Sequence, residues 1–384
     1  MKDYFGGPIK KLGFGFMRLP MLGGVENEID IEQVKAMVDL FMERGYSYYD
    51  TAFVYNNGKS EEAIRAAVTE RYPRDAFQAA TKIPLWRPVD FTQMMALADT
   101  SLQRMGLDFF DVYLLHGVGP DRLEMIDGMK AWEFLAGLQD SGKAKRIGFS
   151  YHGDADGLNR VLDAHADEID LVQLQINYLD WEDEQVQSRR CYEAALDHGM
   201  GIIIMEPIKG GSLANFTPEV AEIFMQADPQ ASVASWALRF ALGLEGVVNV
   251  LSGMSSLEQA KDNIKIAEAM KPLSEAELAV IATAMEEMKK IPTIPCTACR
   301  YCVDDCPEKI NIPRIIEIMN DFSKYQNLPG AKNSYRMATY GAGVFGGAPA
   351  AVASDCTQCG SCELHCPQKI AIIDNLKEAV LLLE

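Results

Sequence analysis

The distribution of cysteine constrains this chain more than any other feature of its sequence. Of the nine cysteines in 384 residues, eight lie between Cys296 and Cys366. They form two runs of one pattern, C-x2-C-x2-C-x3-C followed by proline. The runs contain Cys296, Cys299, Cys302 and Cys306, and then Cys356, Cys359, Cys362 and Cys366. Thiols gathered so densely are typical of a disulfide framework or of a metal site.

The spacing within each run is typical of iron–sulfur proteins. In bacterial two-cluster ferredoxins, three closely spaced cysteines bind one [4Fe–4S] cluster, and the fourth, before proline, binds the other cluster. The two predicted cages are Cys296, Cys299, Cys302 with Cys366, and Cys356, Cys359, Cys362 with Cys306. Zinc is the alternative, but structural zinc sites usually pair two C-x2-C motifs across a longer loop. Disulfides would be unusual in a reducing cytosol.

The first 290 residues alternate short apolar runs with helical patterns. The predicted strands are Leu12–Met17, Tyr46–Asp50, Phe77–Lys82, Asp111–His116, Arg146–Ser150, Leu171–Ile176, Gly201–Glu206 and Val247–Leu251. The helical stretches between them include Ile31–Arg44, Glu61–Arg71, Phe91–Met105 and Glu182–His198. Eight such β/α units in about 270 residues predict a closed (β/α)8 TIM barrel. An open doubly wound sheet is the alternative, but it usually carries a glycine-rich fingerprint that this sequence lacks.

The sequence changes character near Lys290. The segment Ile291–Cys296 contains two prolines and is predicted to be an extended linker. We therefore predict an α/β barrel over residues 1–290 and a small, mainly helical ferredoxin-like domain over residues 291–384. Within the second domain we expect helices at Ile312–Phe322 and Ile372–Leu383 and an irregular loop at Gly341–Pro349.

Net charge and hydropathy limit the partners of the chain. A net charge of −19 opposes binding to nucleic acid or to an anionic membrane. No stretch approaches the roughly 20 apolar residues of a membrane helix, and residues 1–11 lack the apolar core of a signal peptide. We therefore expect a cytoplasmic protein that binds neither nucleic acid nor membrane.

Four polar residues stand at or just after the ends of consecutive predicted strands. Asp50, Lys82 and His116 end the second, third and fourth strands, and Tyr55 follows five residues after Asp50. Because active sites of such barrels lie at the carboxyl ends of the strands, we expect these side chains to converge. A nearby ammonium lowers the pKa of a phenol, so Lys82, held by Asp50, would prepare Tyr55 for proton transfer. His116 would donate a hydrogen bond to a substrate oxygen.

These residues resemble the aldo-keto reductase family. The resemblance is carried by DTAFVYNNGKSE at Asp50–Glu61, by Thr81–Lys82, by LLH at Leu114–His116 and by LGFGFMRLP at Leu12–Pro20. It covers about residues 10–285, and the whole architecture resembles the branch with a C-terminal ferredoxin-like extension. The resemblance implies an oxidoreductase that reduces a small carbonyl compound, or oxidises an alcohol, with NAD(P)(H). Tyr55 would be its general acid and base.

The resemblance also implies contacts to the nucleotide. Ser150 and Gln175 match residues that hold the nicotinamide carboxamide in the family, and Met205 stands where an aromatic residue usually stacks on the ring. After the eighth strand, a loop of small residues opens a helix and is suited to binding phosphate on backbone N–H groups. Members that use NADP usually place cations where this chain has Gly253 and Gln259, so positive charge for the 2′-phosphate is missing at these positions. Lys209 or Lys261 would offset the missing charge. The remaining implied contacts are Ser255 and Asn263.

A hydride site and iron–sulfur clusters in one chain leave three interpretations open. Clusters pass single electrons and nicotinamide passes hydride, so connecting them needs a mediator such as a flavin. In the first interpretation the clusters are structural or sensory beside an NAD(P)H carbonyl reductase. In the second, the barrel binds a flavin and exchanges electrons through the clusters with a ferredoxin-type partner. The third is a redox-sensing regulatory subunit with little turnover, although a pure sensor need not keep Tyr55 and Lys82.

Overall fold

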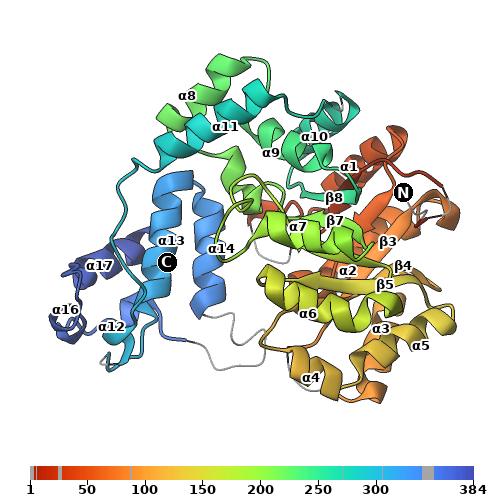
Figure 1. Cartoon of the computed structure of the whole chain (residues 1–384), viewed down its shortest axis with the longest axis horizontal. Helices are drawn as coiled ribbons and strands as arrows, with labels where there is room; N and C mark the ends of the chain where they lie inside the picture. Colours follow the sequence, from red (N-terminus) through yellow and green to blue (C-terminus); the bar gives the residue numbers. More distant parts are fainter. Residues whose placement is uncertain are drawn as a thin grey trace. The chain divides into compact units, whose positions relative to one another are not determined.

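Two units, distinguished by their internal contacts, make up the chain (Figure 1). The computed structural model describes residues 4–5, 7–24, 28–86, 89–269, 271–304, 306–339 and 350–384. The first unit comprises Met1–Lys209 and Ser235–Ser274, and the second comprises Gly210–Ala234 and Glu275–Glu384. The predicted loop Gly341–Pro349 lies outside the described residues. Within the described ranges, no helix combines the length and the apolar composition needed to cross a bilayer.

The first unit contains a closed barrel of parallel strands, which confirms the predicted fold class (Figure 1). The strands are β1 (Leu12–Gly15), β2 (Tyr48–Asp50), β3 (Gln78–Pro84), β4 (Phe110–Val118), β5 (Ala144–Tyr151), β6 (Leu171–Gln175), β7 (Gly201–Met205) and β8 (Val247–Gly253). Each strand pairs with the next in the chain, and β8 closes the barrel against β1 with Gly13 opposite Leu251.

Helices follow the strands of this unit. They are α1 (Ile31–Glu43), α2 (Lys59–Ile64), α3 (Phe91–Met105), α4 (Leu123–Gly128), α5 (Ala131–Asp140), α6 (Ala155–His165), α7 (Ser188–Asp197), α9 (Val233–Gly243) and α10 (Leu257–Ala269). The predicted bounds of α3 are confirmed, because a capping box between Asp90 and Gln93 starts the helix and left-handed Gly106 ends it.

The predicted helix Glu182–His198 was wrong at its start. α7 begins only at Ser188. The Asp183 carboxylate accepts hydrogen bonds from the backbone N–H groups of Gln185 and Val186, both at 2.8 Å, and this forms a turn instead of a helix. Aspartate often stabilises turns in this way, so a polar stretch before a helix is easily mistaken for its first turn.

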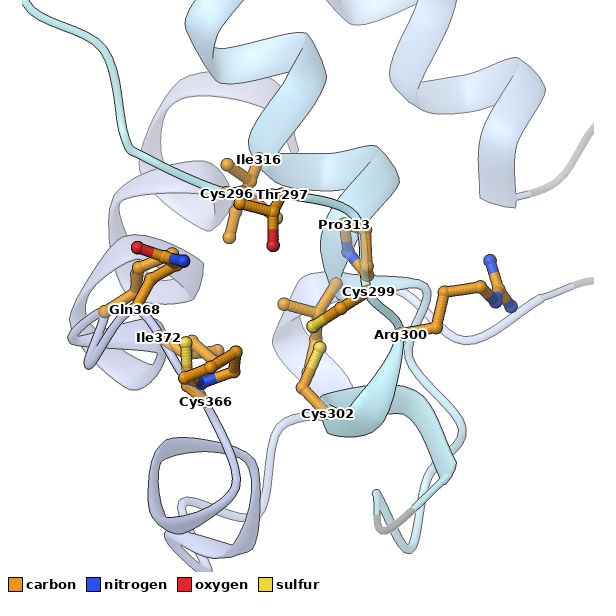
Figure 2. A pocket seen from close by; sticks show the side chains of 13 residues that line it. Cys296, Thr297, Cys299, Arg300, Cys302, Pro313, Ile316, Cys366, Gln368 and Ile372 are labelled. Carbon is orange, nitrogen blue, oxygen red and sulfur yellow. The ribbon is translucent and has the colours of Figure 1, made fainter.

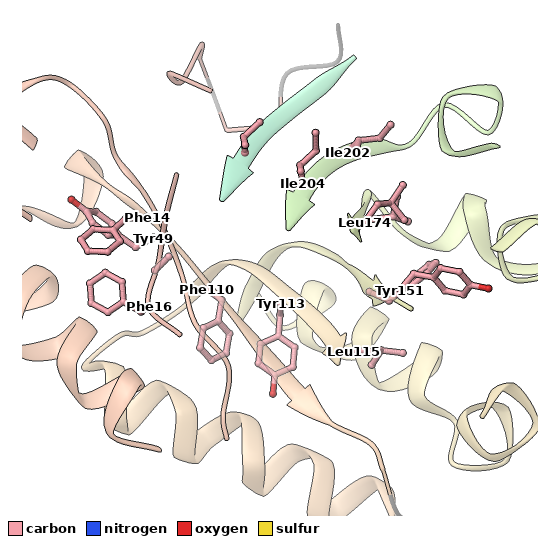
Figure 3. Packing of buried hydrophobic residues seen from close by; sticks show 14 of the residues in the cluster. Phe14, Phe16, Tyr49, Phe110, Tyr113, Leu115, Tyr151, Leu174, Ile202 and Ile204 are labelled. Carbon is pink, nitrogen blue, oxygen red and sulfur yellow. The ribbon is translucent and has the colours of Figure 1, made fainter. Parts of the chain in front are cut away.

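Side chains along the strands alternate between two cores. Outward-facing residues pack beneath the helices, and Figure 3 shows Phe110 and Tyr113 directed from β4 toward a neighbouring helix. A smaller cluster fills the barrel itself and includes Tyr48, Val112, Leu114, Leu171 and Ile203. Because the side-chain period of a strand is two, the next inward positions are Asp50, His116 and Gln173. The barrel interior is therefore apolar toward its amino end and polar toward its carboxyl end.

The N-terminal segment covers the amino end of the barrel. Tyr4 is buried, and its carbonyl oxygen accepts a hydrogen bond of 2.9 Å from Arg146. The ring of Phe5 meets that of Tyr48 at 5.6 Å between centroids. Gly201 leaves space for the Tyr4 ring, since a Cβ at position 201 would lie 2.7 Å from that ring. The polar interior therefore faces the opposite mouth, at the carboxyl ends of the strands.

The second unit is helical and has its own core. Its helices include α8 (Pro218–Ala227), α11 (Glu275–Met288), α12 (Tyr301–Asp304), α13 (Ile312–Tyr325), α14 (Leu328–Thr339), α16 (Ser361–Leu364) and α17 (Ile372–Leu383). Both predicted helices of this region are present, α17 with the predicted bounds and α13 three residues longer than predicted, whereas α14 was not predicted. The segment before the first cysteine has no regular secondary structure, and the Asn320 side chain bonds both the N–H and the C=O of Ile294, at 2.8 and 2.9 Å.

Candidate active site and metal centres

The structure brings the four predicted catalytic side chains together in the polar end of the barrel. Lys82 Nζ lies 2.5 Å from Asp50 Oδ1 and 2.8 Å from the carbonyl oxygen of Thr51. The same ammonium lies 5.2 Å from the centroid of the Tyr55 ring. The Tyr55 and His116 rings meet edge-on with 5.6 Å between centroids, and Trp86 stands 5.3 Å from His116 on another side. An ammonium, a carboxylate, a phenol and an imidazole thus lie close together at one end of the barrel.

The Asp50–Lys82 pair is fully enclosed by protein. Burial alone lowers the pKa of Lys82, but the charge of Asp50 and the contacts with Tyr55 outweigh it and leave that pKa raised. Burial raises the pKa of Asp50, while Lys82 and a hydrogen bond from Gln173 oppose the rise. Sequence reasoning missed Gln173, whose only signal is a polar residue at an inward position of β6. The pair keeps Lys82 charged beside Tyr55.

The structure corrects the expected pKa of Tyr55. The charge of Lys82 does lower it, as predicted, but burial is the larger effect and leaves the pKa raised above 10. Tyr55 is therefore a neutral phenol at neutral pH and holds a proton that it can donate. Burial, followed by the charge of Lys82, lowers the pKa of His116 well below 6.5, so that imidazole is neutral too. His116 Nδ1 is buried and has no hydrogen-bond partner among the described residues.

The lowered pKa of His116 predicts a pH-dependent stability. The unfolded chain takes up a proton on this residue below pH 6.5 that the folded chain excludes, so unfolding becomes easier as the pH falls. Between roughly pH 7.5 and pH 5.5, wild type should lose about 1 kcal/mol of unfolding free energy relative to a His116→Gln variant. Urea unfolding at both pH values measures this difference. Parallel losses in the two proteins would show that His116 is protonated in the folded state.

A second ionic network holds the loop that carries Tyr55. Glu61 is fully buried, accepts a hydrogen bond of 2.8 Å from Thr81 and contacts Arg104 at 3.2 Å. Arg104 also donates to the carbonyl oxygen of Phe53 at 3.1 Å. Gly58 adopts φ +87°, and a Cβ there would lie 2.8 Å from the Arg104 guanidinium. The network therefore ties the Tyr55 loop to the strand that bears Lys82.

Loss of Arg104 should destabilise the fold. In an Arg104→Met variant, the buried Glu61 carboxylate would keep only Thr81 as a side-chain partner, and we expect the unfolding free energy to drop by about 2 kcal/mol. The matched control is Lys35→Met, which removes a cation from an exposed pair with Glu32 and should cost about 0.3 kcal/mol. Chemical unfolding of both variants tests the difference. Equal losses would mean that Glu61 finds another partner.

The predicted carboxamide contacts lie around the same mouth. Ser150 Oγ accepts a hydrogen bond of 2.9 Å from the backbone N–H of Gly117, which leaves its own hydroxyl proton available. Gln175 donates to the buried carboxylate of Asp180 at 2.8 Å, and Lys209 contacts the same carboxylate at 2.6 Å. Lys209 therefore supports Gln175 through Asp180, instead of presenting a free charge to a nucleotide phosphate.

The loop after β8 is ordered by its own side chains. Gln259 Oε1 accepts a hydrogen bond of 2.7 Å from the backbone N–H of Ser255, and the Ser255 hydroxyl donates to the carbonyl oxygen of Arg18 at 2.9 Å. Asn263 is buried and donates to Ser252 at 2.9 Å, so it shapes the loop from behind. Gly253, at the end of β8, is exposed.

One ion pair at this mouth was not foreseen from the sequence. Arg18 donates to Glu206 Oε1 with both terminal guanidinium nitrogens, each at 3.2 Å. Glu206 follows β7 and adopts a left-handed φ of 54°, a strained conformation for this residue type. The charges of both residues act on the pKa of Tyr55, in opposite directions. Only the folded barrel brings these two distant residues together.

Two cavities in the second unit gather eight of the nine cysteines. The first is lined by Cys296, Cys299, Cys302 and Cys366, and the second by Cys306, Cys356, Cys359 and Cys362. Each cavity thus collects one of the two predicted sets. Figure 2 shows Cys299 and Cys302 facing Cys366 across the first cavity. The other lining residues are mostly apolar, and four thiolates around an apolar space fit the ligand requirement of a [4Fe–4S] cluster.

The thiols of these cavities are spread around a space and do not converge on a point. Among residues in the described ranges, no three His, Cys, Asp or Glu side chains come close enough to hold a single metal ion. A tetrahedral zinc site needs its four sulfurs about 2.3 Å from one atom. The spacing therefore suits a larger group than one zinc ion.

Comparisons with known proteins agree with this geometry. The profile of the aldo/keto reductase family matches residues 11–286. The chain belongs to the aldo/keto reductase family. A 4Fe-4S dicluster domain profile matches residues 295–371, the segment that contains the eight clustered cysteines.

Curated relatives of this aldo/keto reductase are distant. An aldo-keto reductase of Mycolicibacterium smegmatis is 34% identical over 36% of this chain and 47% of the relative. Methylglyoxal reductase DkgA of Yersinia pestis is 27% identical over 60% of this chain and 79% of the relative. The NADH-specific methylglyoxal reductase of Escherichia coli is 26% identical over 64% and 83%. The chain spans about half the length of the first of these relatives.

Solved structures resemble the barrel. An aldo/keto reductase from Klebsiella pneumoniae in complex with NADP and acetate has a TM-score of 0.58 at 21% identity, covering 72% of this chain and 91% of that one. The holo form of an aldo-keto reductase from Bacillus halodurans has a TM-score of 0.55 at 22% identity, covering 71% and 91%. At this level of identity, the likeness supports the fold.

Proposed function

We propose that this aldo/keto reductase reduces the carbonyl group of a small molecule with a reduced nicotinamide nucleotide. The observation that carries the proposal is the neutral Tyr55 phenol beside the Lys82 ammonium and the neutral His116 imidazole. Bound reduced nicotinamide supplies the hydride. As negative charge develops on the substrate oxygen, Tyr55 delivers its proton and His116 stabilises the oxygen by a hydrogen bond.

Lys82 and Asp50 act through Tyr55 in this proposal. Once the phenol has given up its proton, the Lys82 ammonium stabilises the remaining phenolate. Asp50, at 2.5 Å, keeps Lys82 charged in a site where burial would otherwise neutralise it. Ser150 and Gln175 are proposed to orient the carboxamide of the nicotinamide, with Gln175 held by the Asp180–Lys209 pair.

The nucleotide is proposed to need no 2′-phosphate. Neither Gly253 nor Gln259 brings a cation to the loop after β8, and Lys209 is engaged by Asp180. One relative is described as NADH-specific, whereas one structural neighbour holds NADP. We expect NADH to support catalysis with a kcat/KM within about tenfold of that for NADPH, a margin of about 1.4 kcal/mol.

In this proposal the clusters are structural or sensory, because an electron path between them and a nicotinamide would need a mediator such as a flavin. Exchange of electrons with a ferredoxin-type protein belongs to the flavin-containing alternative. Cys299 and Cys359 are exposed, so each cavity reaches the surface of the second unit. Eight cysteines that must remain thiolates also suggest a reducing compartment such as the cytoplasm.

An anaerobic purification followed by a reductase assay tests the proposal. Methylglyoxal is a suitable first substrate because two of the relatives are named for its reduction. Oxidation of NADH or NADPH that depends on methylglyoxal or another small aldehyde supports the proposal. Absence of turnover, with flavin released when the protein is denatured, would refute it in favour of a flavin-containing barrel.

A further inference from the structure

The two cysteine runs fold alike, so their corresponding residues can be compared directly. Left-handed backbone occurs at the same places in both, at Ala298 and Gln358, at Arg300 and Gly360, and at Lys309 and Lys369. Each run gives its first three cysteines to one cavity and its last cysteine to the other. The two cavities are therefore built from equivalent parts.

Two of these equivalent positions differ in charge. Between the second and third cysteine, the first cavity is lined by Arg300 and the second by Gly360. After the last cysteine and its proline, Gln368 lines the first cavity and Glu308 lines the second. Among the described lining residues other than cysteine, the first cavity thus has a cation and the second a carboxylate.

Arg300 stands at a backbone position that favours glycine. Arg300 adopts φ +68°, and the corresponding Gly360 adopts φ +78°. Glycine occupies this conformation without strain, whereas arginine does not. Figure 2 shows the Arg300 side chain directed away from the thiols, so the guanidinium would act on a cluster through its field and not by contact. Arg300 follows Cys299 in the chain and is among the residues that line the first cavity, and the field of its charge extends over a Debye length of roughly 8 Å at physiological ionic strength.

We propose that this asymmetry gives the two clusters different reduction potentials, so that a single electron rests on the cluster held by Cys296, Cys299, Cys302 and Cys366. Adding one electron adds one negative charge to a cluster, and nearby charge is among the factors that set its potential. Arg300 favours the reduced form of the first cluster, and Glu308 opposes reduction of the second. The inference depends on the two clusters and not on the substrate of the barrel.

Single-cluster variants of the full chain measure each potential separately. Cys306→Ala with Cys356→Ala leaves the first cluster, and Cys296→Ala with Cys366→Ala leaves the second. Each variant is titrated anaerobically with dithionite and followed by electron paramagnetic resonance. We expect the reduction potential of the first cluster to be at least about 59 mV higher than that of the second. For a one-electron couple, this difference is a tenfold preference of the electron for the first cluster. Equal potentials, or the reverse order, would overturn the proposal.

Charge substitutions then test the cause in chains that bind both clusters. Arg300→Gly with Glu308→Gln gives both runs the same residues at these positions. The preference of the electron for the first cluster over the second should then fall to threefold or less. Each single substitution should give an intermediate value, and glycine suits the backbone at position 300. The control is Lys289→Gln, which removes an exposed charge that lines neither cavity. Iron content confirms that every variant is loaded, and a preference unchanged in the double variant would contradict the assignment to Arg300 and Glu308.

Discussion

Replacement of Tyr55 by phenylalanine should lower kcat/KM for carbonyl reduction by about 10³-fold, within the usual range for loss of a general acid. The substitution removes the hydroxyl that is proposed to carry the proton and leaves the ring, with its packing against His116, in place. Binding of the nucleotide should change little, because its proposed contacts are Ser150 and Gln175. Steady-state kinetics with methylglyoxal and a fluorescence titration with NADPH measure the two effects separately.

The matched control for this experiment is Tyr192→Phe. Its hydroxyl donates to the backbone carbonyl of Glu245 at 2.7 Å, on α7 and away from the barrel mouth. We expect that variant to keep kcat/KM within about twofold of wild type, since an exposed hydrogen bond contributes little. If Tyr55→Phe retained more than a tenth of wild-type activity, the proton would have to come from another group, and His116 would be the next candidate.

Pairwise loss of cysteines should remove the clusters in a pattern set by the two cavities. Cys306→Ala with Cys356→Ala removes two ligands of one cage, so about four of about eight iron atoms per chain should remain. Cys306→Ala with Cys296→Ala removes one ligand from each cage, so both clusters should be lost. Because metal binding is coupled to folding, the second variant should also lose helical structure in the second unit.

Iron and zinc analysis, together with visible absorption, reads out both variants. If each run instead held its own cluster, the pattern would be reversed, since Cys296 and Cys306 would then share one cage. The variant Cys191→Ala is the control, because this buried thiol lines neither cavity and burial raises its pKa to about 12. Zinc in place of iron in the wild-type protein would contradict the cluster assignment altogether.

Much of the fold was predictable because its signals are local. Each strand is a short apolar run that can be recognised from the residues next to it in the sequence. All eight predicted strands are present. The start of α7 was predicted wrongly because the turn at Asp183 depends on side chain to backbone hydrogen bonds that composition does not reveal. α14 was not predicted, although it forms part of the second core.

The tetrad was predictable for a different reason. Asp50 ends β2, and Lys82 and His116 lie two residues before the ends of β3 and β4. The rule that strand ends converge in a barrel is enough to group them. The residues around the tetrad, such as Arg18 and Glu206, have no sequence signal of this kind. Arg18 and Glu206 are separated by most of the barrel in sequence, and their pairing at 3.2 Å exists only once the strands close into a ring.

The sequence alone determined which residues can do chemistry here: the spacing of the cysteines selects cluster ligands, and the strand-end residues select a proton-transfer site. Only the tertiary structure decided their electrostatics, because a pKa depends on burial and on charges distant in sequence. It left the Tyr55 pKa raised, although Lys82 alone would lower it, and it bound Lys209 to Asp180. It also assigned Gly210–Ala234, which follows the seventh strand of the barrel, to the helical second unit, since packing depends on contacts that order along the chain does not record.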